Sequence, residues 1–175
     1  MDNAWIQSYT GKKVYPLNIK PEEIDIVDIA WGLSNKCRYN GHTSRFYSVA
    51  EHSILVSQCV PKKYRLEGLL HDAAEAYLPD VPRPIKHLLM GFKEIEEDME
   101  RIIAEKYKLI FPYPDEVKEA DTDIINNEYE ALMPNPYNHY WSGLSGNKLS
   151  VEVIGCSSKI ANEWFLEIFE RLKRR

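Results

Sequence analysis

Residues 68–78 read GLLHDAAEAYL, an apolar segment interrupted by side chains that can bind a cation or carry a proton. The apolar residues in and around it recur three or four positions apart, as they do in an amphipathic helix. The spacing predicts one helix from about residue 62, just after Pro61, to residue 78. His71 and Asp72 would lie in the middle of this helix. Because an unpaired buried carboxylate is costly, we expect Asp72 to meet a cation or another charged group.

Helical periodicity covers most of the remaining chain. Ser48 is a suitable helix cap, and Glu51 three residues later completes a capping-box pattern. Apolar spacing predicts further helices over residues 21–37, 48–59, 84–90, 92–109, 115–132 and 150–175. The first twenty residues predict an irregular arm or a short hairpin. Because alternating strand patterns are nearly absent, the expected fold class is all-α, with one helical domain over residues 1–175.

Composition excludes several classes of protein. The chain has 175 residues, of which 44% are hydrophobic and 28% charged, as in a globular protein and unlike a disordered or fibrous one. A net charge of −5 without a basic stripe argues against binding of a nucleic-acid polymer. No run reaches the ~18 apolar residues of a membrane span, and the N-terminus lacks an apolar signal region, so we expect a cytoplasmic protein without a membrane partner. The three cysteines form no CxxC pair, which argues against a disulfide framework and a thiolate zinc site.

Two more side chains of the type that binds metals stand on apolar helix faces. On its own, His52 would be interpreted as a buried histidine satisfied by one hydrogen bond, and Asp121 as a carboxylate at the solvent edge of its helix. With His71 and Asp72 they make a set of two imidazoles and two carboxylates, which suits a transition metal such as zinc, cobalt, manganese or iron. Four protein ligands leave positions open on an octahedral ion, as a catalytic site requires. Calcium is not expected, because its sites use about six to eight oxygens.

The order of these motifs resembles the HD-domain metal-dependent phosphohydrolases. The matching segments are VAEHS (49–53), LLHDAAEAYLPDVPRPIK (69–86) and KEAD (118–121), within a resemblance that spans about residues 26–130. The resemblance implies a helical bundle with a metal site between core helices. The implied ion is zinc, cobalt or manganese, with magnesium as a candidate second ion. Carried over by position, the implied metal ligands are His52, His71, Asp72 and Asp121.

Within this family the chain is most similar to small enzymes acting on deoxynucleotides, the bacterial 5′-deoxynucleotidases and the phage dATP triphosphohydrolases. The short chain and the stretch DIAWGLSNKCRYNGHTSRFYSVAEHS (28–53) look more like the phage enzymes. The resemblance therefore implies hydrolysis of dATP to deoxyadenosine and triphosphate, in control of the nucleotide pool. Three alternatives stay open: a 5′-deoxynucleotidase of deoxynucleoside monophosphates, a non-catalytic nucleotide-binding HD protein, and an unrelated redox metalloprotein. The last would need a second histidine cluster, and the chain has only five histidines.

Two acids near the histidine-aspartate pair are the candidate catalytic residues. Glu75 follows His71 by four positions and would point to the same side of a helix. It would serve as a general base or orient the attacking water; the alternative is a hydrogen-bond acceptor that fixes a ligand histidine. The resemblance assigns Asp80 to proton transfer or water positioning, whereas its place in a proline-rich turn is equally typical of a loop cap.

Five residues are candidate substrate contacts. Arg38 and Lys86 are proposed phosphate ligands because a cation stabilises the charge of a phosphoryl group; otherwise they would be ordinary surface bases. Tyr39 and Pro84 would line a base pocket, although packing alone would explain both. Tyr39 stands where the bacterial nucleotidases have tryptophan. His42, in a turn, is a further candidate contact.

The expected partners are a deoxynucleotide substrate and further copies of the same chain. The resemblance implies a homo-oligomer, a dimer or a hexamer. Aromatic residues that would suit such a contact are Tyr137, Tyr140 and Trp141.

Overall fold

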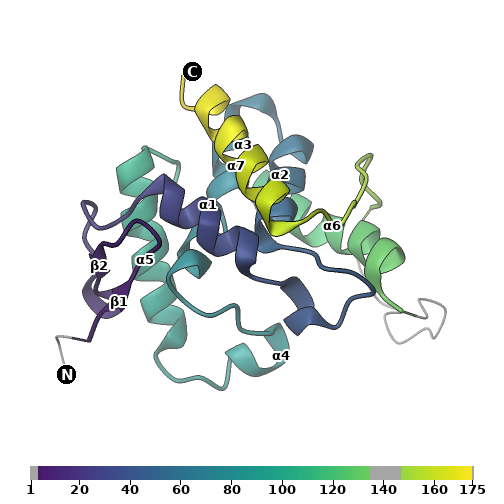
Figure 1. Ribbon diagram of the computed structural model, residues 1–175. Helices are drawn as coiled ribbons and strands as arrows, with labels where there is room; N and C mark the ends of the chain where they lie inside the picture. Colours follow the sequence, from purple (N-terminus) through teal and green to yellow (C-terminus); the bar gives the residue numbers. More distant parts are fainter. Residues whose placement is uncertain (1–3, 135–146, 175) are drawn as a thin grey trace.

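The computed structural model describes residues 4–134 and 147–174 and confirms the all-α class (Figure 1). The helices are α1 (Ile26–Asn35), α2 (Val49–Cys59), α3 (Arg65–Leu70), α4 (Arg83–Lys86), α5 (Phe92–Tyr107), α6 (Asp115–Leu132) and α7 (Ser158–Leu172). Short 3-10 turns are η1 (Pro16–Asn18), η2 (Arg38–Gly41), η3 (Lys62–Tyr64) and η4 (Ala73–Ala76). The N-terminal arm is a hairpin, in which β1 (Ile6–Gln7) pairs antiparallel with β2 (Lys13–Val14). Tyr137, Tyr140 and Trp141 lie outside the described residues.

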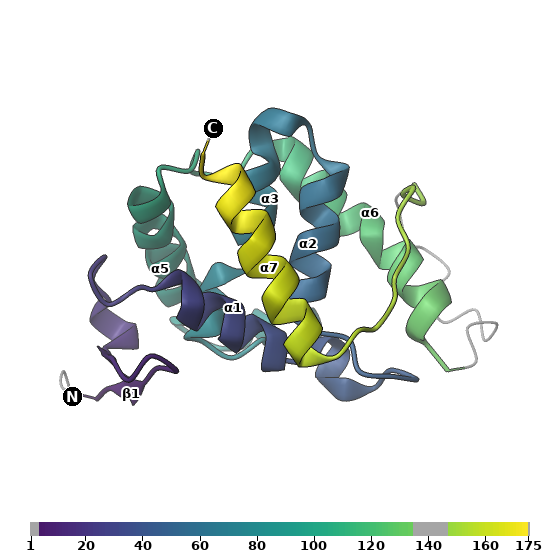
Figure 2. The same ribbon diagram turned by 45° about the horizontal axis from the view of Figure 1, so that its top comes forward.

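Helix α2 is the centre of the fold. Every residue from Val49 to Ser57 is buried, because α2 packs against α1, α3, α6 and α7. Figure 2 shows α7 lying across α1 and α2, with α5 and α6 on opposite sides. A helix buried all round is predominantly apolar, so a polar side chain on it requires a partner. His52 lies in the middle of α2 and is fully buried.

Of the two hydrogen bonds of the predicted capping box at the start of α2, one is present. The hydroxyl of Ser48 accepts the amide N–H of Glu51 at 3.1 Å, as expected of an N-cap. The Glu51 carboxylate does not return to Ser48. It accepts the amides of Ile154, Gly155 and Cys156 at 2.8–2.9 Å, on the segment that leads into α7. Glu51 therefore ties the C-terminal segment to the core helix.

This tie explains why the predicted helix over residues 150–175 begins late, at Ser158. Amides that hydrogen-bond to Glu51 cannot join a helical ladder, and Gly155 has a left-handed φ of 72°. The amide group of Asn127 also holds the backbone at Leu149 and Val151. The prediction from periodicity was wrong here because side chains distant in sequence hold residues 149–156 in a non-helical conformation.

The predicted single helix over residues 62–78 is also wrong. It is divided into η3, α3, a turn at His71 and Asp72, and η4. The ring of His71 donates to the carbonyl of Gly68 at 2.9 Å, and the Tyr113 hydroxyl donates to that of Leu70 at 3.3 Å. These side chains occupy carbonyls that a continuing helix would use. The histidine-aspartate pair consequently lies at a helix end.

Smaller corrections concern other helix ends. Helix α1 begins at Ile26 instead of residue 21, because the Asp25 carboxylate caps it by accepting the amide of Val27. It ends at Asn35, two residues earlier than predicted. Helix α4 stops at Lys86 and α5 at Tyr107, whereas α6 has the predicted bounds. Within residues 4–134 and 147–174, no helix combines the length and the apolar character needed to cross a bilayer.

Candidate metal centre and adjoining cavity

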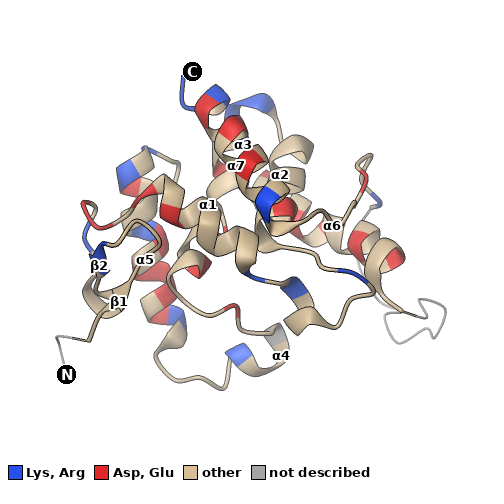
Figure 3. Cartoon of the chain, viewed as in Figure 1, with Lys and Arg blue, Asp and Glu red and all other residues tan. Residues whose placement is uncertain are grey.

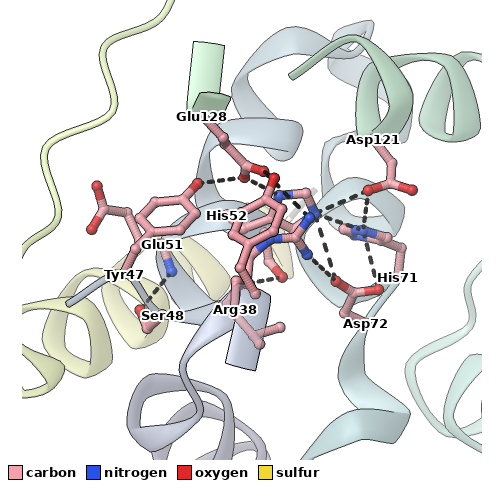
Figure 4. Close-up of polar contacts among 12 residues, drawn as sticks. Arg38, Tyr47, Ser48, Glu51, His52, His71, Asp72, Asp121 and Glu128 are labelled. Carbon is pink, nitrogen blue, oxygen red and sulfur yellow. Dashed lines mark hydrogen bonds and ion pairs between the residues drawn. The ribbon is translucent and has the colours of Figure 1, made fainter. Parts of the chain in front are cut away.

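Four side chains from three parts of the chain meet at one point (Figure 4). Atom Nε2 of His52 lies 3.4 Å from Nε2 of His71 and 3.1 Å from Oδ1 of Asp121. The Asp72 carboxylate lies 3.3 Å from Nε2 of His71 and 3.6 Å from Nε2 of His52. Ligand atoms of His52, His71 and Asp72 all lie within 4.8 Å of one another. The structure thus brings together all four residues predicted as metal ligands.

In each of the two imidazoles, the hydrogen bond made by Nδ1 determines that Nε2 is the unprotonated nitrogen. Nδ1 of His52 lies 2.7 Å from a carboxylate oxygen of Glu128, and Nδ1 of His71 lies 2.9 Å from the carbonyl of Gly68. Both partners accept hydrogen bonds, so each Nδ1 carries a proton and each neutral ring presents its lone pair at Nε2. Such support for a ligand histidine fixes its tautomer and orientation.

Two lone pairs that face each other at 3.4 Å, next to two carboxylates, repel unless a cation lies among them. In the ion-free protein this cation is a proton. Burial alone would lower the pKa of His71, but Asp72 and Asp121 raise it to about 9. For Asp121, burial would raise the pKa, but hydrogen bonds from His52 and His71 hold it far below its ordinary value. The same donor set fits a divalent transition metal, because it offers two imidazole nitrogens and carboxylate oxygens.

Glu128 stabilises the candidate metal centre by accepting a hydrogen bond from Nδ1 of His52. This role was not predicted from the sequence. Glu128 is fully buried on α6, where it accepts hydrogen bonds from His52, from the Tyr47 hydroxyl at 2.7 Å and from the Tyr39 hydroxyl. A guanidinium nitrogen of Arg38 lies 3.4 Å from the same carboxylate. Burial would raise the pKa of Glu128, but Arg38 and His52 lower it to about 2, so it stays ionised. Its spacing of seven residues from Asp121 was the available signal, because that spacing puts both on one helix face.

A cavity of about 460 Å³ opens beside the centre. Asp72 and Asp121 form part of its wall. The other predicted site residues that line it are Arg38, Tyr39, Glu75, Asp80, Pro84 and Lys86. Its size is within the usual range of pockets for small molecules, about 300–1,000 Å³. His42 is exposed and is not among the described residues that line the cavity, so the structure does not bring it to the site.

Charges around the cavity are mixed. Arg38 lies 3.6 Å from Asp72, and Lys86 on α4 forms an ion pair of 2.5 Å with Glu96 on the acidic helix α5 (Figure 3). One carboxylate oxygen of Glu75 is buried without a hydrogen-bond partner among the described residues. Burial, together with Asp72 and Asp80, raises the pKa of Glu75 to about 9. Glu75 therefore holds a proton far more tightly than an ordinary carboxyl group.

The turn that carries Tyr39 has an uncommon backbone conformation. Tyr39 and Asn40 both lie in the left-handed region, with φ values of 55° and 50°, and both line the cavity. Consecutive left-handed residues other than glycine are strained and persist only where the surroundings hold them. Here the Tyr39 hydroxyl is held by Glu128. The two strained residues, Tyr39 and Asn40, therefore form part of the wall of the candidate site.

Two known proteins are similar to this chain over about three quarters of their length. Uncharacterized protein YfdR of Escherichia coli (strain K12) is 44% identical over 129 residues, which cover 74% of this chain and 72% of YfdR. Uncharacterized protein RCAP_rcc00048 of Rhodobacter capsulatus is 35% identical over 146 residues, 75% of this chain and 74% of that protein. The chain belongs to the YfdR family. No protein-family model matches it.

In this member of the YfdR family, the four candidate ligands come from different kinds of element. His52 is fixed within the buried helix α2, and Asp121 lies on α6. His71 and Asp72 lie at the break between α3 and η4. Glu75 is on η4 and not, as predicted, one turn further along a continuous helix, although it still lines the cavity. The break is therefore part of the site, because it presents Asp72 and Glu75 to the same cavity.

Proposed function

We propose that this YfdR-family chain is an HD-domain metal-dependent phosphohydrolase that acts on deoxynucleotides. The observation that carries the proposal is the meeting of two Nε2 lone pairs and two carboxylates at the wall of a cavity that also presents Arg38 and Lys86. His52, His71, Asp72 and Asp121 would hold the ion, which is zinc, cobalt or manganese, with magnesium as a candidate second ion. A divalent ion there would polarise a phosphoryl oxygen and lower the pKa of a water molecule.

The residues of the chain supply binding and proton transfer. Arg38 and Lys86 are placed to bind phosphate oxygens from the cavity wall, where charge-assisted hydrogen bonds are strong. Asp80 would receive the proton of the attacking water at a carboxylate oxygen, and Glu75, which holds its own proton, would orient that water. Tyr39 and Pro84 supply apolar surface for a base.

Two substrates follow from different observations. The resemblance to phage dATP triphosphohydrolases favours dATP, with deoxyadenosine and triphosphate as products. The charge of the described cavity lining favours a deoxynucleoside monophosphate, since it contains two cations, Arg38 and Lys86, against the acids Asp72, Asp80 and Asp121, while Glu75 holds its proton. A triphosphate brings more negative charge into that lining than a monophosphate does. The second candidate function is therefore a 5′-deoxynucleotidase.

Product analysis separates these functions. Purified protein is incubated with Co²⁺, Mn²⁺ or Zn²⁺ and with panels of deoxynucleoside triphosphates, ribonucleoside triphosphates and deoxynucleoside monophosphates. Deoxyadenosine with intact triphosphate identifies the triphosphohydrolase, and phosphate released from monophosphates alone identifies the nucleotidase. Asp72→Ala should abolish turnover, whereas Glu119→Ala, an exposed acid on α6, should not change it. Nucleotide binding without turnover under any metal would overturn the enzyme proposal and favour the non-catalytic nucleotide-binding protein.

The proposal includes a homo-oligomer, a dimer or a hexamer. Light scattering at several protein concentrations measures the mass in solution, and a monomer of 20.4 kDa throughout would contradict it.

A further inference from the structure

Lys36 joins three elements around the candidate site. It is the residue at the C-terminal end of α1, and its backbone carbonyl accepts the amide of Val49 at 3.0 Å, at the start of α2. Its side chain is partly buried and extends toward η4. One residue therefore connects the end of α1, the start of the helix that carries His52, and the turn that follows the histidine-aspartate pair.

The ammonium group of Lys36 binds two carbonyls of this turn. Nζ donates to the carbonyl of Glu75 and, at 2.5 Å, to that of Leu78. Four residues earlier on α1, Gly32 lies so close to η4 that an added Cβ would be 3.1 Å from Cα of Ala76. Helix α1 thus holds η4 by close backbone packing at one point and by an ammonium group at the next turn.

The segment that Lys36 holds carries the two acids of the proposed chemistry. Glu75 is on η4, Asp80 follows shortly after Leu78, and both line the cavity. An oxygen of Glu75 has no hydrogen-bond partner among the described residues, so its place depends on the backbone that carries it. Burial lowers the pKa of Lys36, and the neighbouring acids Glu75 and Asp80 oppose this shift.

We infer that Lys36 is a positioning residue: by fixing the carbonyls of Glu75 and Leu78, it places the carboxyl groups of Glu75 and Asp80 in the cavity. The kinetic part of this inference rests on the proposed function. Lys36 itself does not line the cavity among the described residues, so it acts through the acids and not on the substrate.

The kinetic test compares Lys36→Met, Lys36→Arg and Lys118→Met, the last on an exposed lysine of α6. With the substrate found by product analysis, Lys36→Met should lower kcat about 10–100-fold, the usual effect of losing a supporting contact. KM and the affinity for Zn²⁺ should stay within about threefold, because the phosphate and metal ligands are intact. Lys36→Arg should recover most of kcat, because a guanidinium still donates to carbonyls. Unchanged kcat in Lys36→Met, a parallel loss of Zn²⁺ affinity, or no recovery with arginine would overturn the inference.

A second measurement does not depend on activity. The amides of Glu75, Tyr77 and Leu78 are hydrogen-bonded within the segment, to Asp72 and Ala74 carbonyls. Their hydrogen exchange should become at least about tenfold faster in Lys36→Met, while exchange within α6 stays as in the wild type. Unchanged exchange at these amides would overturn the inference even in an active enzyme. If the wild type hydrolyses nothing, the proposed function fails, and the exchange result still decides whether Lys36 holds the turn.

Discussion

Nε2 of His52 and Nε2 of His71 face each other at 3.4 Å, each on a ring whose other nitrogen is already hydrogen-bonded. One histidine comes from the buried helix α2 and the other from the end of α3, so only the packed fold creates this pair. The arrangement places two basic nitrogens where a single cation can bind both.

Divalent metal should stabilise the protein through these histidines. At a free Zn²⁺ or Mn²⁺ concentration about 100 times Kd, binding adds ~2.7 kcal/mol to the free energy of unfolding. For a chain of this size that raises Tm by about 5–10 °C, and a chelator should reverse the shift. The shift is measured by thermal unfolding followed by circular dichroism. His71→Ala should lose it, whereas His87→Ala, at an exposed histidine, should keep it. An equal shift in His71→Ala would place the metal elsewhere.

Removal of Glu128 should weaken both the fold and the metal centre. Glu128→Leu removes one of the two carboxylates beside the half-buried Arg38 and leaves two tyrosine hydroxyls without their acceptor, at a cost of about 3–5 kcal/mol. Glu128→Gln retains the shape and one acceptor oxygen, so it should fold while its metal affinity falls about 10–100-fold. Urea unfolding and Zn²⁺ titration measure the two effects. Glu130→Gln, an exposed site on the same helix, is the control, and an unchanged Zn²⁺ affinity in Glu128→Gln would contradict the role of Glu128.

Glu51 should contribute strongly to stability and not to metal binding. Glu51→Ala leaves three backbone amides, those of Ile154, Gly155 and Cys156, without their acceptor. Because the segment lies near the surface and water replaces part of the loss, we expect a cost of about 2–4 kcal/mol in urea unfolding. Glu152→Ala, at an exposed acid close by, should change stability by less than ~0.5 kcal/mol. A similar small effect in Glu51→Ala would show that the tie is dispensable.

Asp25 should stabilise the protein in a pH-dependent way. The hydrogen bond from Lys12, at 2.8 Å, and the capped amide of Val27 lower the pKa of Asp25 below its ordinary value. A lowered pKa means that the contribution is present above the unfolded value of about 3.9 and is lost as pH falls through the folded value. Asp25→Ala should therefore cost about 1 kcal/mol at pH 7 and progressively less below pH 4.

Urea midpoints of wild type and variant at pH 7, 5 and 3 measure this difference. Asp25→Asn retains a capping oxygen but not the charge, so its deficit at pH 7 should be smaller than that of Asp25→Ala. A deficit in Asp25→Ala that stays constant from pH 7 to pH 3 would show that the carboxylate charge is not what stabilises α1.

Much of the helical content was predictable because it depends on local spacing. The bounds of α6 and the cap at Ser48 follow from apolar periodicity and from one short-range hydrogen bond. The helix ends that were wrong depend on distant partners: Tyr113 and the ring of His71 interrupt residues 62–78, and Glu51 delays α7. No local pattern contains these contacts. His42, predicted as a substrate contact from its place in a turn, is not among the described residues that line the cavity.

By itself the sequence determined the helical class and the four candidate ligands, because a polar side chain on an apolar helix face is visible from spacing alone. Only the tertiary structure decided that these four side chains meet, which imidazole nitrogens face one another, that Glu128 holds His52, and that Lys36 binds the carbonyls of Glu75 and Leu78. The physical reason is that direction and distance between side chains on different helices depend on packing. The spacing of residues in the sequence specifies which face of a helix a side chain occupies. The packing of the helices specifies which other side chains that face contacts.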